Sequence, residues 1–270
     1  MEPAICIEMF YEGLSPEEKV IKTTRHGFHN IEFWGYADKD IGVLGALKQE
    51  PWRAHYVNFS GQRSGDLIDA STHQTLLDDV ARTILVARRL GTSTLMVLSN
   101  ELGQGGRVVH PHPEISNAEK RENTVSGLKK VMGIVPQDMT IVIEPLNTVL
   151  DHAGYFLSRI EDTIDILGEV GDRRLKVLCD FYHLAMMGGN PVSIAQRYSE
   201  YIGHIHIADY PGRNEPGTGQ GDWHAVLTAL ADRGYEGYVG FELAPSKNSD
   251  DALETIAALW KEVFGDKSLS

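Results

Sequence analysis

A chain of 270 residues that is 42% hydrophobic and 23% charged has the composition of a globular protein and is long enough for one large α/β domain. Its formal net charge of −13 provides no overall basic field for a phosphate backbone, which argues against nucleic acid as a partner and favours a small polar metabolite. The first residues do not form a basic segment followed by an apolar run, and no stretch approaches the roughly 18 apolar residues of a membrane-spanning helix. We therefore expect a cytoplasmic protein that does not bind membranes.

The first half of the chain alternates predicted strands and helices. Short apolar and β-branched runs predict strands at 4–10, 30–34, 54–60 and 94–99. Helices are predicted from 16 to about 27, over a short piece before residue 54, from about 72 to 90, and from about 116 to 132. Ser15-Pro16-Glu17-Glu18 forms a capping box, and Gly91 is placed to end the 72–90 helix.

The second half repeats the pattern. Strands are predicted at 140–145, 175–180, 202–208 and 238–243, with helices near 160–169, 192–201, 223–233 and 251–264. Eight short strands alternating with helices, without a linker, predict a single-domain (β/α)8 TIM barrel over residues 1–270. An open doubly wound sheet is the alternative, but no Gly-x-Gly-x-x-Gly turn follows the first strand. Cys6 and Cys179 lie in apolar strand runs, where we expect them to pack as buried side chains.

Four potential metal ligands stand at or near the carboxyl ends of consecutive predicted strands: Glu144, Asp180, His206 and Glu242. In a (β/α)8 barrel the reactive groups lie at these strand ends, so the four side chains should converge. One such acid alone is more often a helix cap or a hydrogen-bond acceptor, but four on successive strands indicate a shared site. Three carboxylates with one imidazole suit Mn²⁺, Mg²⁺ or Co²⁺, and they would repel one another without a cation. We therefore expect one bound divalent metal ion.

Other residues are candidates for substrate binding at the same end of the barrel. His183 and Arg213 follow Asp180 and His206 in loops from which they could reach a ligand over the metal. An arginine there would position an anionic or polyhydroxyl substrate through its planar donors, although an ordinary surface arginine is an equal alternative. Glu32 and His55, on earlier strands, complete the candidate substrate-binding set.

A further group of residues is expected to have a smaller part in the site. His204 shares the face of His206 one layer deeper, so we expect it to be buried and hydrogen-bonded, as a structural residue or a support of the site. Trp34 is on an early strand and is a candidate for the same mouth. For the remaining three, exposure or a structural hydrogen bond is the expected role: Tyr36, His152 and Glu215.

Several short motifs extend over most of the chain. They are Ile143-Glu144-Pro145-Leu146-Asn147-Thr148, Gly154-Tyr155-Phe156-Leu157, Asp180-Phe181-Tyr182-His183, His206-Ile207-Ala208-Asp209 with Pro211-Gly212-Arg213, Glu215-Pro216-Gly217-Thr218-Gly219 and Gly240-Phe241-Glu242. Together they resemble the xylose isomerase-like sugar isomerase/epimerase superfamily, in particular its hydroxypyruvate isomerase-like branch. The resemblance implies a TIM barrel that binds one divalent metal ion through Glu144, Asp180, His206 and Glu242. It also implies that Glu144 and Glu242 transfer protons, that His183 and Arg213 contact the substrate, and that the chain forms a homo-oligomer, a dimer or a tetramer.

The sequence departs from the resembling groups at two positions. Hydroxypyruvate isomerases tend to carry glutamine where His206 stands, whereas ketose 3-epimerases carry histidine there. The epimerases tend to place a second acid six residues after the first metal-binding glutamate, and Leu150 occupies that position here. The substrate therefore remains open between these groups.

The predicted function is a metal-dependent isomerase of a small ketose, ketoaldonate or hydroxypyruvate-type substrate. A proton would leave a carbon beside a carbonyl to give a metal-stabilised enediolate, with Glu144 and Glu242 as acid and base in an order that the sequence does not fix. A ketose 3-epimerase is the alternative. An abasic-site endonuclease agrees less well with the −13 charge and with one four-ligand set, and a non-catalytic sugar-binding barrel would bind a metal without exchanging substrate protons. The substrate is expected to be unphosphorylated, since no glycine-rich phosphate cradle follows the last two strands.

Overall fold

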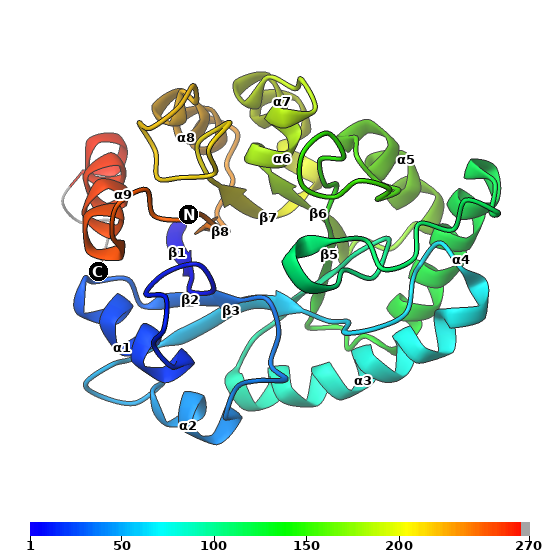
Figure 1. Ribbon diagram of the computed structural model, residues 1–270, viewed down its shortest axis with the longest axis horizontal. Coiled ribbons are helices and arrows are strands. Elements are labelled where there is room, and N and C mark those ends of the chain that lie inside the picture. Colours follow the sequence, from blue (N-terminus) through cyan, green and yellow to red (C-terminus); the bar gives the residue numbers. More distant parts are fainter. Residues whose placement is uncertain (266–270) are drawn as a thin grey trace.

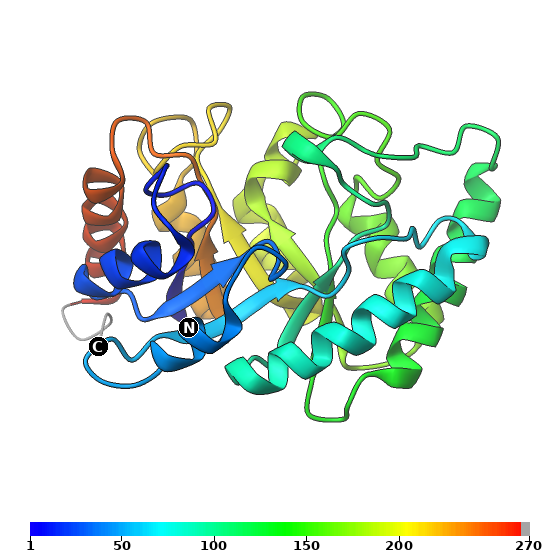
Figure 2. The same cartoon turned by 60° about the horizontal axis from the view of Figure 1, so that its bottom comes forward.

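The strands form a closed parallel barrel. A computed structural model describes residues 1–265, and residues 266–270, the end of the predicted 1–270 domain, lie outside the described part. Each strand pairs with its neighbours in chain order, and β1 pairs with β8 to close the sheet. Helices surround this barrel, as Figures 1 and 2 show. The predicted (β/α)8 TIM barrel is therefore confirmed.

The strands occupy the predicted places along the chain but are shorter than several of the predicted runs. They are β1 Glu2–Cys6, β2 Asn30–Phe33, β3 His55–Ser60, β4 Thr94–Val97, β5 Thr140–Ile143, β6 Leu175–Asp180, β7 Ile202–Ile207 and β8 Tyr238–Phe241. The predictions 4–10, 94–99, 140–145 and 238–243 run past the strand ends. Apolar residues such as Phe10, Leu98 and Leu243 follow those ends and stay buried under the loops, so the hydrophobic run outlasts the strand.

The helices agree with the predicted segments, with one short helix that was not predicted. They are α1 Pro16–Arg25, α2 Ile41–Ala46, α3 His73–Leu90, α4 Asn117–Ile134, α5 Ile160–Val170, α6 Phe181–Met186, α7 Pro191–Tyr198, α8 Trp223–Asp232 and α9 Ser249–Phe264, with 3₁₀ turns at Ala70–Thr72, Gln104–Gly106 and Ser199–Tyr201. The capping box at Ser15 is present, and Gly91 ends α3 in the left-handed region at φ 79°. The unpredicted helix is α6, which starts directly after β6.

The first and last helices lie side by side at the seam of the barrel. Figure 1 shows α9 beside α1. The carboxylate of Asp250, in α9, accepts a hydrogen bond from the Tyr11 hydroxyl at 2.7 Å and lies 3.1 Å from His26, which follows α1. Cys6 and Cys179 are free and buried, as predicted. Within residues 1–265, no helix combines the length and the hydropathy needed to cross a membrane.

Candidate active site

The four predicted metal ligands meet at the carboxyl end of the barrel. Glu144 directly follows β5, Asp180 ends β6, His206 is the last residue but one of β7, and Glu242 directly follows β8. Asp180 and His206 are partners in the β6–β7 register, which sets their side chains next to each other. All four side chains are buried. The strand-end rule therefore brings three acids and one imidazole together in one buried space.

The donor atoms of this cluster surround His206 Nδ1. This nitrogen lies 3.5 Å from Glu242 Oε2, 3.9 Å from Glu144 Oε1 and 4.0 Å from Asp180 Oδ2. Ligand atoms bound to one ion at about 2.0–2.2 Å lie about 3–4 Å from one another. The spacing of the four donors therefore fits a single small cation.

Three of the donor atoms have no hydrogen-bond partner among residues 1–265. These buried atoms are Glu144 Oε1, Asp180 Oδ2 and His206 Nδ1. A buried polar atom without a partner is costly, and it marks a place where another species satisfies it. Two carboxylate oxygens and an imidazole nitrogen, all unpaired and facing one point, fit a hard or borderline divalent metal ion.

The charges of the cluster shift the pKa values of its members. Burial raises the pKa of Glu144 and of Asp180, and repulsion from Glu242 raises both further. Burial would also raise the pKa of Glu242, but the adjacent Arg213 guanidinium holds it well below its usual range. The site thus concentrates more negative charge than its own cation balances, which is the electrostatic condition for binding a divalent ion.

Asp180 is oriented by the helix that follows it. Its Oδ1 atom caps α6 by accepting a hydrogen bond from the His183 backbone N–H at 3.1 Å, which directs Oδ2 to the cluster. An aspartate at an N-cap is typical because it satisfies a free amide of the first turn. The same short helix carries His183 to the site, with Nε2 lying 3.6 Å from Asp180 Oδ2.

His183 is held in one tautomer by Asn147, a residue that was not among the predicted site residues. The Asn147 side-chain amide donates to His183 Nδ1 at 2.8 Å and to Asp151 at 2.7 Å. Because Nδ1 accepts this bond, the ring proton is on Nε2, toward the carboxylates. Burial, followed by the charge of Arg213, lowers the pKa of His183 well below its usual value and keeps the ring neutral. Asn147 belongs to the motif Glu144-Pro145-Leu146-Asn147, but a local motif does not reveal a contact with a residue 36 positions away.

Arg213 reaches the cluster from the loop after β7. Its Nη2 atom donates to Glu242 Oε2 at 2.5 Å, and its guanidinium lies over the ring of Tyr182, 5.1 Å from the ring centroid. The backbone of Arg213 is in the left-handed region, at φ 56°, which is unusual for a residue with a Cβ atom. Tyr182 in turn donates its hydroxyl proton to Asp151 at 2.8 Å, so Arg213 and His183 share one supporting network.

Trp34 covers the other side of Glu242. Its indole N–H donates to Glu242 Oε1 at 2.5 Å, while 49% of the residue surface is exposed at the mouth. An exposed aromatic ring with its polar edge held by a buried carboxylate offers an apolar wall for the carbon chain of a ligand. Both oxygens of Glu242 are thus engaged, one by Trp34 and the other by Arg213.

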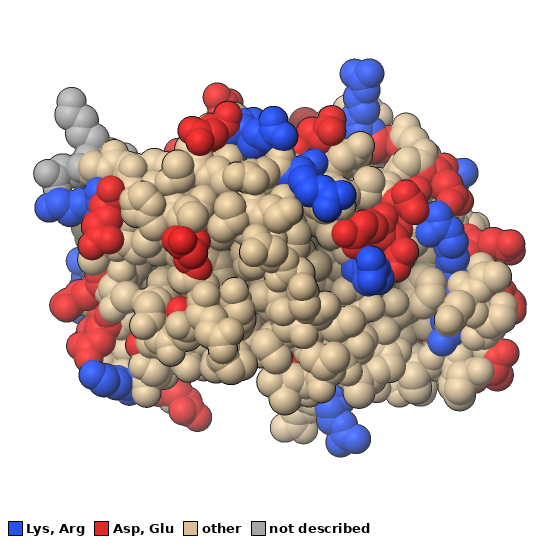
Figure 3. All heavy atoms as spheres, turned by 90° about the horizontal axis from the view of Figure 1, so that it is seen from above, with Lys and Arg blue, Asp and Glu red and all other residues tan. Residues whose placement is uncertain are grey.

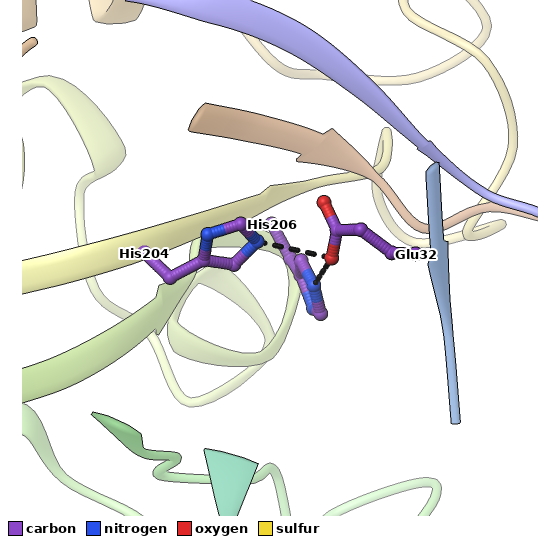
Figure 4. Close-up of side chains that lie close together, drawn as sticks. All are labelled: Glu32, His204 and His206. Carbon is purple, nitrogen blue, oxygen red and sulfur yellow. Dashed lines mark hydrogen bonds and ion pairs between the residues drawn. The ribbon is translucent and has the colours of Figure 1, made fainter. Parts of the chain in front are cut away.

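Glu32 and His204 lie below the cluster instead of in the mouth. Figure 4 shows the Glu32 carboxylate facing both imidazoles of β7. Glu32 Oε2 is 2.9 Å from His206 Nε2 and 3.0 Å from His204 Nε2. His204 is buried one layer deeper, as predicted. The structure thus places Glu32, which was predicted to bind substrate, behind a metal-ligand candidate.

The structure does not bring His55, which was predicted to bind substrate, to this site. It is the first residue of β3, at the amino end of the barrel, where its Nδ1 lies 3.2 Å from Asn30 and 3.3 Å from the Tyr238 hydroxyl. The prediction considered which strand carries His55 but not which end of that strand the residue occupies.

The three weaker candidates have different surroundings. Tyr36 packs against the core from the loop after β2. Glu215 is buried and accepts hydrogen bonds from the backbone and hydroxyl of Ser246, so it joins two loops. His152 is buried, with Nδ1 2.6 Å from the Gly106 carbonyl and its ring 5.1 Å from that of His183. Only His152 lies near the cluster.

Known proteins share both the sequence pattern and the fold. The sequence model of the family described as xylose isomerase-like TIM barrel matches residues 22–262. A putative hydroxypyruvate isomerase of Drosophila melanogaster is 34% identical over 249 residues, which cover 90% of this chain and 90% of that protein. The hydroxypyruvate isomerase of Escherichia coli (strain K12) is 26% identical over 240 residues, which cover 86% and 89%.

Solved structures superpose along nearly the whole chain. An AP endonuclease of family 2 from Brucella melitensis has a TM-score of 0.85 at 22% identity, covering 96% of this chain and 99% of that one. A D-psicose 3-epimerase, solved in the presence of D-fructose, has a TM-score of 0.77 at 16% identity and covers 98% and 100%. At these identities the likeness concerns the fold alone.

Proposed function

The chain belongs to the xylose isomerase-like TIM-barrel family and is an isomerase, and from this premise we propose that it is a metal-dependent isomerase of a small, unphosphorylated keto acid or sugar. The hydroxypyruvate isomerases among its relatives support a short substrate with a carbonyl beside a hydroxyl-bearing carbon. The reaction moves a proton between two neighbouring carbons.

The proposed metal ligands are Glu144, Asp180, His206 and Glu242. The single observation that carries the proposal is the convergence of three buried, unpartnered donor atoms on one point from three consecutive strands. A bound divalent ion would polarise the carbonyl group of the substrate and stabilise the negative charge that develops on its oxygens.

Proton transfer is proposed for Glu144 and Glu242. Glu242 is held by Arg213 and Trp34, which fixes the direction of its carboxylate. Glu144 would bind the metal through its unpartnered Oε1, and its second carboxylate oxygen would approach a carbon-bound proton. One glutamate removes the proton and the other, or the same one, returns it to the neighbouring carbon.

The remaining residues of the site would bind and orient the substrate. His183, with its proton on Nε2, can donate a hydrogen bond to a substrate oxygen, and Arg213 can hold a carboxylate or hydroxyl groups through its planar donors. The Trp34 ring shields the reacting carbons from water on one side.

Metal analysis followed by solvent-deuterium exchange tests the proposal on one sample. We expect about one divalent ion per chain and deuterium uptake from D₂O at the carbon beside the carbonyl of hydroxypyruvate or of a small ketose or ketoaldonate. Glu144→Gln and Glu242→Gln should each nearly abolish the exchange with the fold intact. Glu215→Gln, which changes a buried glutamate outside the cluster, should retain it.

The same experiment separates the proposed isomerase from a ketose 3-epimerase and from a protein that only binds its ligand. A ketose 3-epimerase, favoured by the histidine at 206, would exchange the proton on C3 of a ketose and return it to either face. A metal-bound protein that exchanges no proton on any of these substrates would contradict catalysis and leave a binding role.

An abasic-site endonuclease is tested by a DNA-binding measurement. Tight, salt-sensitive binding of abasic DNA would contradict the isomerase proposal. Figure 3 shows lysines and arginines interspersed with acids on the face it displays, with no continuous basic patch there.

A further inference from the structure

The buried carboxylate of Glu32 crosses the inside of the barrel to reach β7. It extends from β2 and meets two imidazoles that lie two residues apart on β7, and its hydrogen-bond partner His206 is 174 positions away in the sequence (Figure 4). The hydrogen bond joins Glu32 Oε2 to His206 Nε2 at 2.9 Å, and the same oxygen is 3.0 Å from His204 Nε2. Only 2% of the Glu32 surface is exposed.

This contact decides which nitrogen of His206 faces the metal-ligand cluster. A carboxylate next to Nε2 accepts a hydrogen bond from an Nε2–H group, so the lone pair of the neutral ring is on Nδ1. Nδ1 is the atom that lies 3.5–4.0 Å from the oxygens of Glu242, Glu144 and Asp180. Without Glu32, the ring could take the other tautomer and present an N–H to the place where a metal would bind.

Gly240 provides independent support for the importance of this arrangement. It is the partner of His206 in the β7–β8 register and lies between that strand and β1. A Cβ atom at this position would be 2.2 Å from Glu32 Oε1 and 2.8 Å from His206 Cδ2. Every other residue would therefore displace the pair, and a glycine at this point of β8 leaves the space that the pair occupies.

His204 is the second imidazole that contacts Glu32 Oε2. Glu32 Oε1 has no hydrogen-bond partner in residues 1–265, so the carboxylate is placed through Oε2 and the two rings that reach it. The rings of His204 and His206 meet edge to face, with centroids 5.3 Å apart. His204 thus limits the rotation of both Glu32 and His206.

We propose that Glu32, braced by His204, is a positioning residue that fixes His206 as an Nδ1 ligand and thereby sets the affinity of the site for its metal ion. The inference rests on the proposed function, because it assumes that His206 binds a divalent cation. Glu32 itself touches neither metal nor substrate in this role. A carboxylate that accepts the second ring N–H of a ligating histidine typically contributes 10–100-fold to metal affinity.

The affinity for Co²⁺, titrated through its visible absorption, tests the role without measuring activity. Glu32→Gln keeps the size of the side chain but removes its charge, and we expect it to weaken Co²⁺ binding by about 10-fold or more. Glu215→Gln is the matched control: Glu215 is also a buried glutamate, but its carboxylate accepts hydrogen bonds from Ser246, so its change should leave the Co²⁺ affinity unaltered. Equal affinity in Glu32→Gln and the unaltered protein would overturn the inference.

A second measurement on the unaltered protein covers the case in which Glu32→Gln does not fold. Long-range ¹H–¹⁵N correlation spectra of the Zn²⁺-loaded protein, with ¹⁵N-labelled histidine, should show His206 protonated at Nε2 and bound through Nδ1. Binding through Nε2 would contradict the inference. If the unaltered protein binds no Co²⁺ or Zn²⁺ at all, the proposed function fails first; if it binds both ions and Glu32→Gln binds them equally well, only the role of Glu32 fails.

Discussion

Glu242 is held at both oxygens, and Trp34 provides one of the two bonds. The indole N–H donates to Oε1 and the ring extends into the mouth. Trp34→Phe would keep an aromatic wall but remove the donor. Since a hydrogen bond to a charged group contributes about 1.5–3 kcal/mol, we expect kcat/KM for the isomerised substrate to fall by roughly 10-fold or more.

The matched control for Trp34→Phe is Trp52→Phe. Trp52 lies before β3 and stacks with Arg25 at 5.2 Å, away from the cluster. Steady-state kinetics should show little change for this variant. Full activity in Trp34→Phe would mean that Arg213 alone orients Glu242.

Asn147 is the residue whose replacement should affect stability and substrate binding together. It is fully buried, donates to His183 and Asp151, and accepts from the backbone N–H groups of Leu150 and Asp151 at 3.1 Å each. Asn147→Ala leaves these groups unpaired, so we expect the free energy of unfolding to fall by about 1–3 kcal/mol. KM should rise as well, because His183 loses its fixed tautomer.

Urea unfolding and steady-state kinetics check the Asn147 prediction. Asn123→Ala is the comparison variant, since Asn123 makes one side-chain bond, to the Ile68 carbonyl at 2.9 Å, at a partly buried position. Its loss of stability should be smaller and its KM unchanged. A KM for Asn147→Ala equal to that of the unaltered protein would contradict the role assigned to the His183 tautomer.

Two loops at the carboxyl end of the barrel, one after β3 and one after β4, contact each other through the ionisable side chain of His112. His112 Nε2 lies 3.2 Å from Asp66 and 4.0 Å from Asp69, across the two loops, and its Nδ1 lies 2.9 Å from Glu114. Burial alone would lower the pKa of His112, but hydrogen bonds with Glu114 and Asp66 raise it above its usual value. The charged ring therefore stabilises the packing of the two loops.

The contribution of His112 to stability should disappear as the pH rises. A histidine whose pKa is higher in the folded than in the unfolded chain stabilises the fold fully below the unfolded value, and this contribution is lost as the pH rises through the folded value. The difference in unfolding free energy between the unaltered protein and His112→Gln should thus be larger near pH 5.5 than near pH 8.5. A difference that stays constant between these two pH values would show that the contact does not depend on the charge of the ring.

The positions of the strands and helices could be predicted from the sequence, but several of their ends could not. Short apolar runs separated by amphipathic segments were enough to identify eight strands, because parallel barrel strands are buried on both faces. Residues such as Phe10 and Leu98 lengthened the predicted strands because loops that cover a barrel end also bury apolar side chains. The short helix α6 was missed since six residues carry too little periodicity.

The metal-ligand candidates could be predicted at the level of the whole molecule, while their supports could not. Glu144, Asp180, His206 and Glu242 follow from one rule that applies to every strand of a barrel. The contact of Glu32 with His206 depends on which side chains meet across the closed barrel, and no local pattern contains that information. His55 was assigned to the site for a related reason. The sequence pattern indicates which strand carries His55, but it does not show that this residue lies at the amino end of the barrel.

Metal binding should stabilise the whole barrel. A ligand at 100 times its Kd adds about 2.7 kcal/mol to the stability of the folded state, which corresponds to a rise in Tm of roughly 5–10 °C for a domain of this size. We expect such a rise on adding Mn²⁺ to chelator-treated protein, measured by scanning calorimetry. Asp180→Asn should reduce the shift, and an equal shift in this variant would show that Mn²⁺ binds elsewhere.

The two halves of the chain contribute different things to the site. All four proposed ligands come from β5 to β8, whereas Glu32 and Trp34, which hold two of these ligands in place, come from β2 and the loop after it. Substitutions in the first half can thus change how His206 and Glu242 are oriented without changing any of the four ligands. A chimera that keeps this second half and takes its first half from another barrel would therefore keep all four ligands but replace the two residues that hold His206 and Glu242.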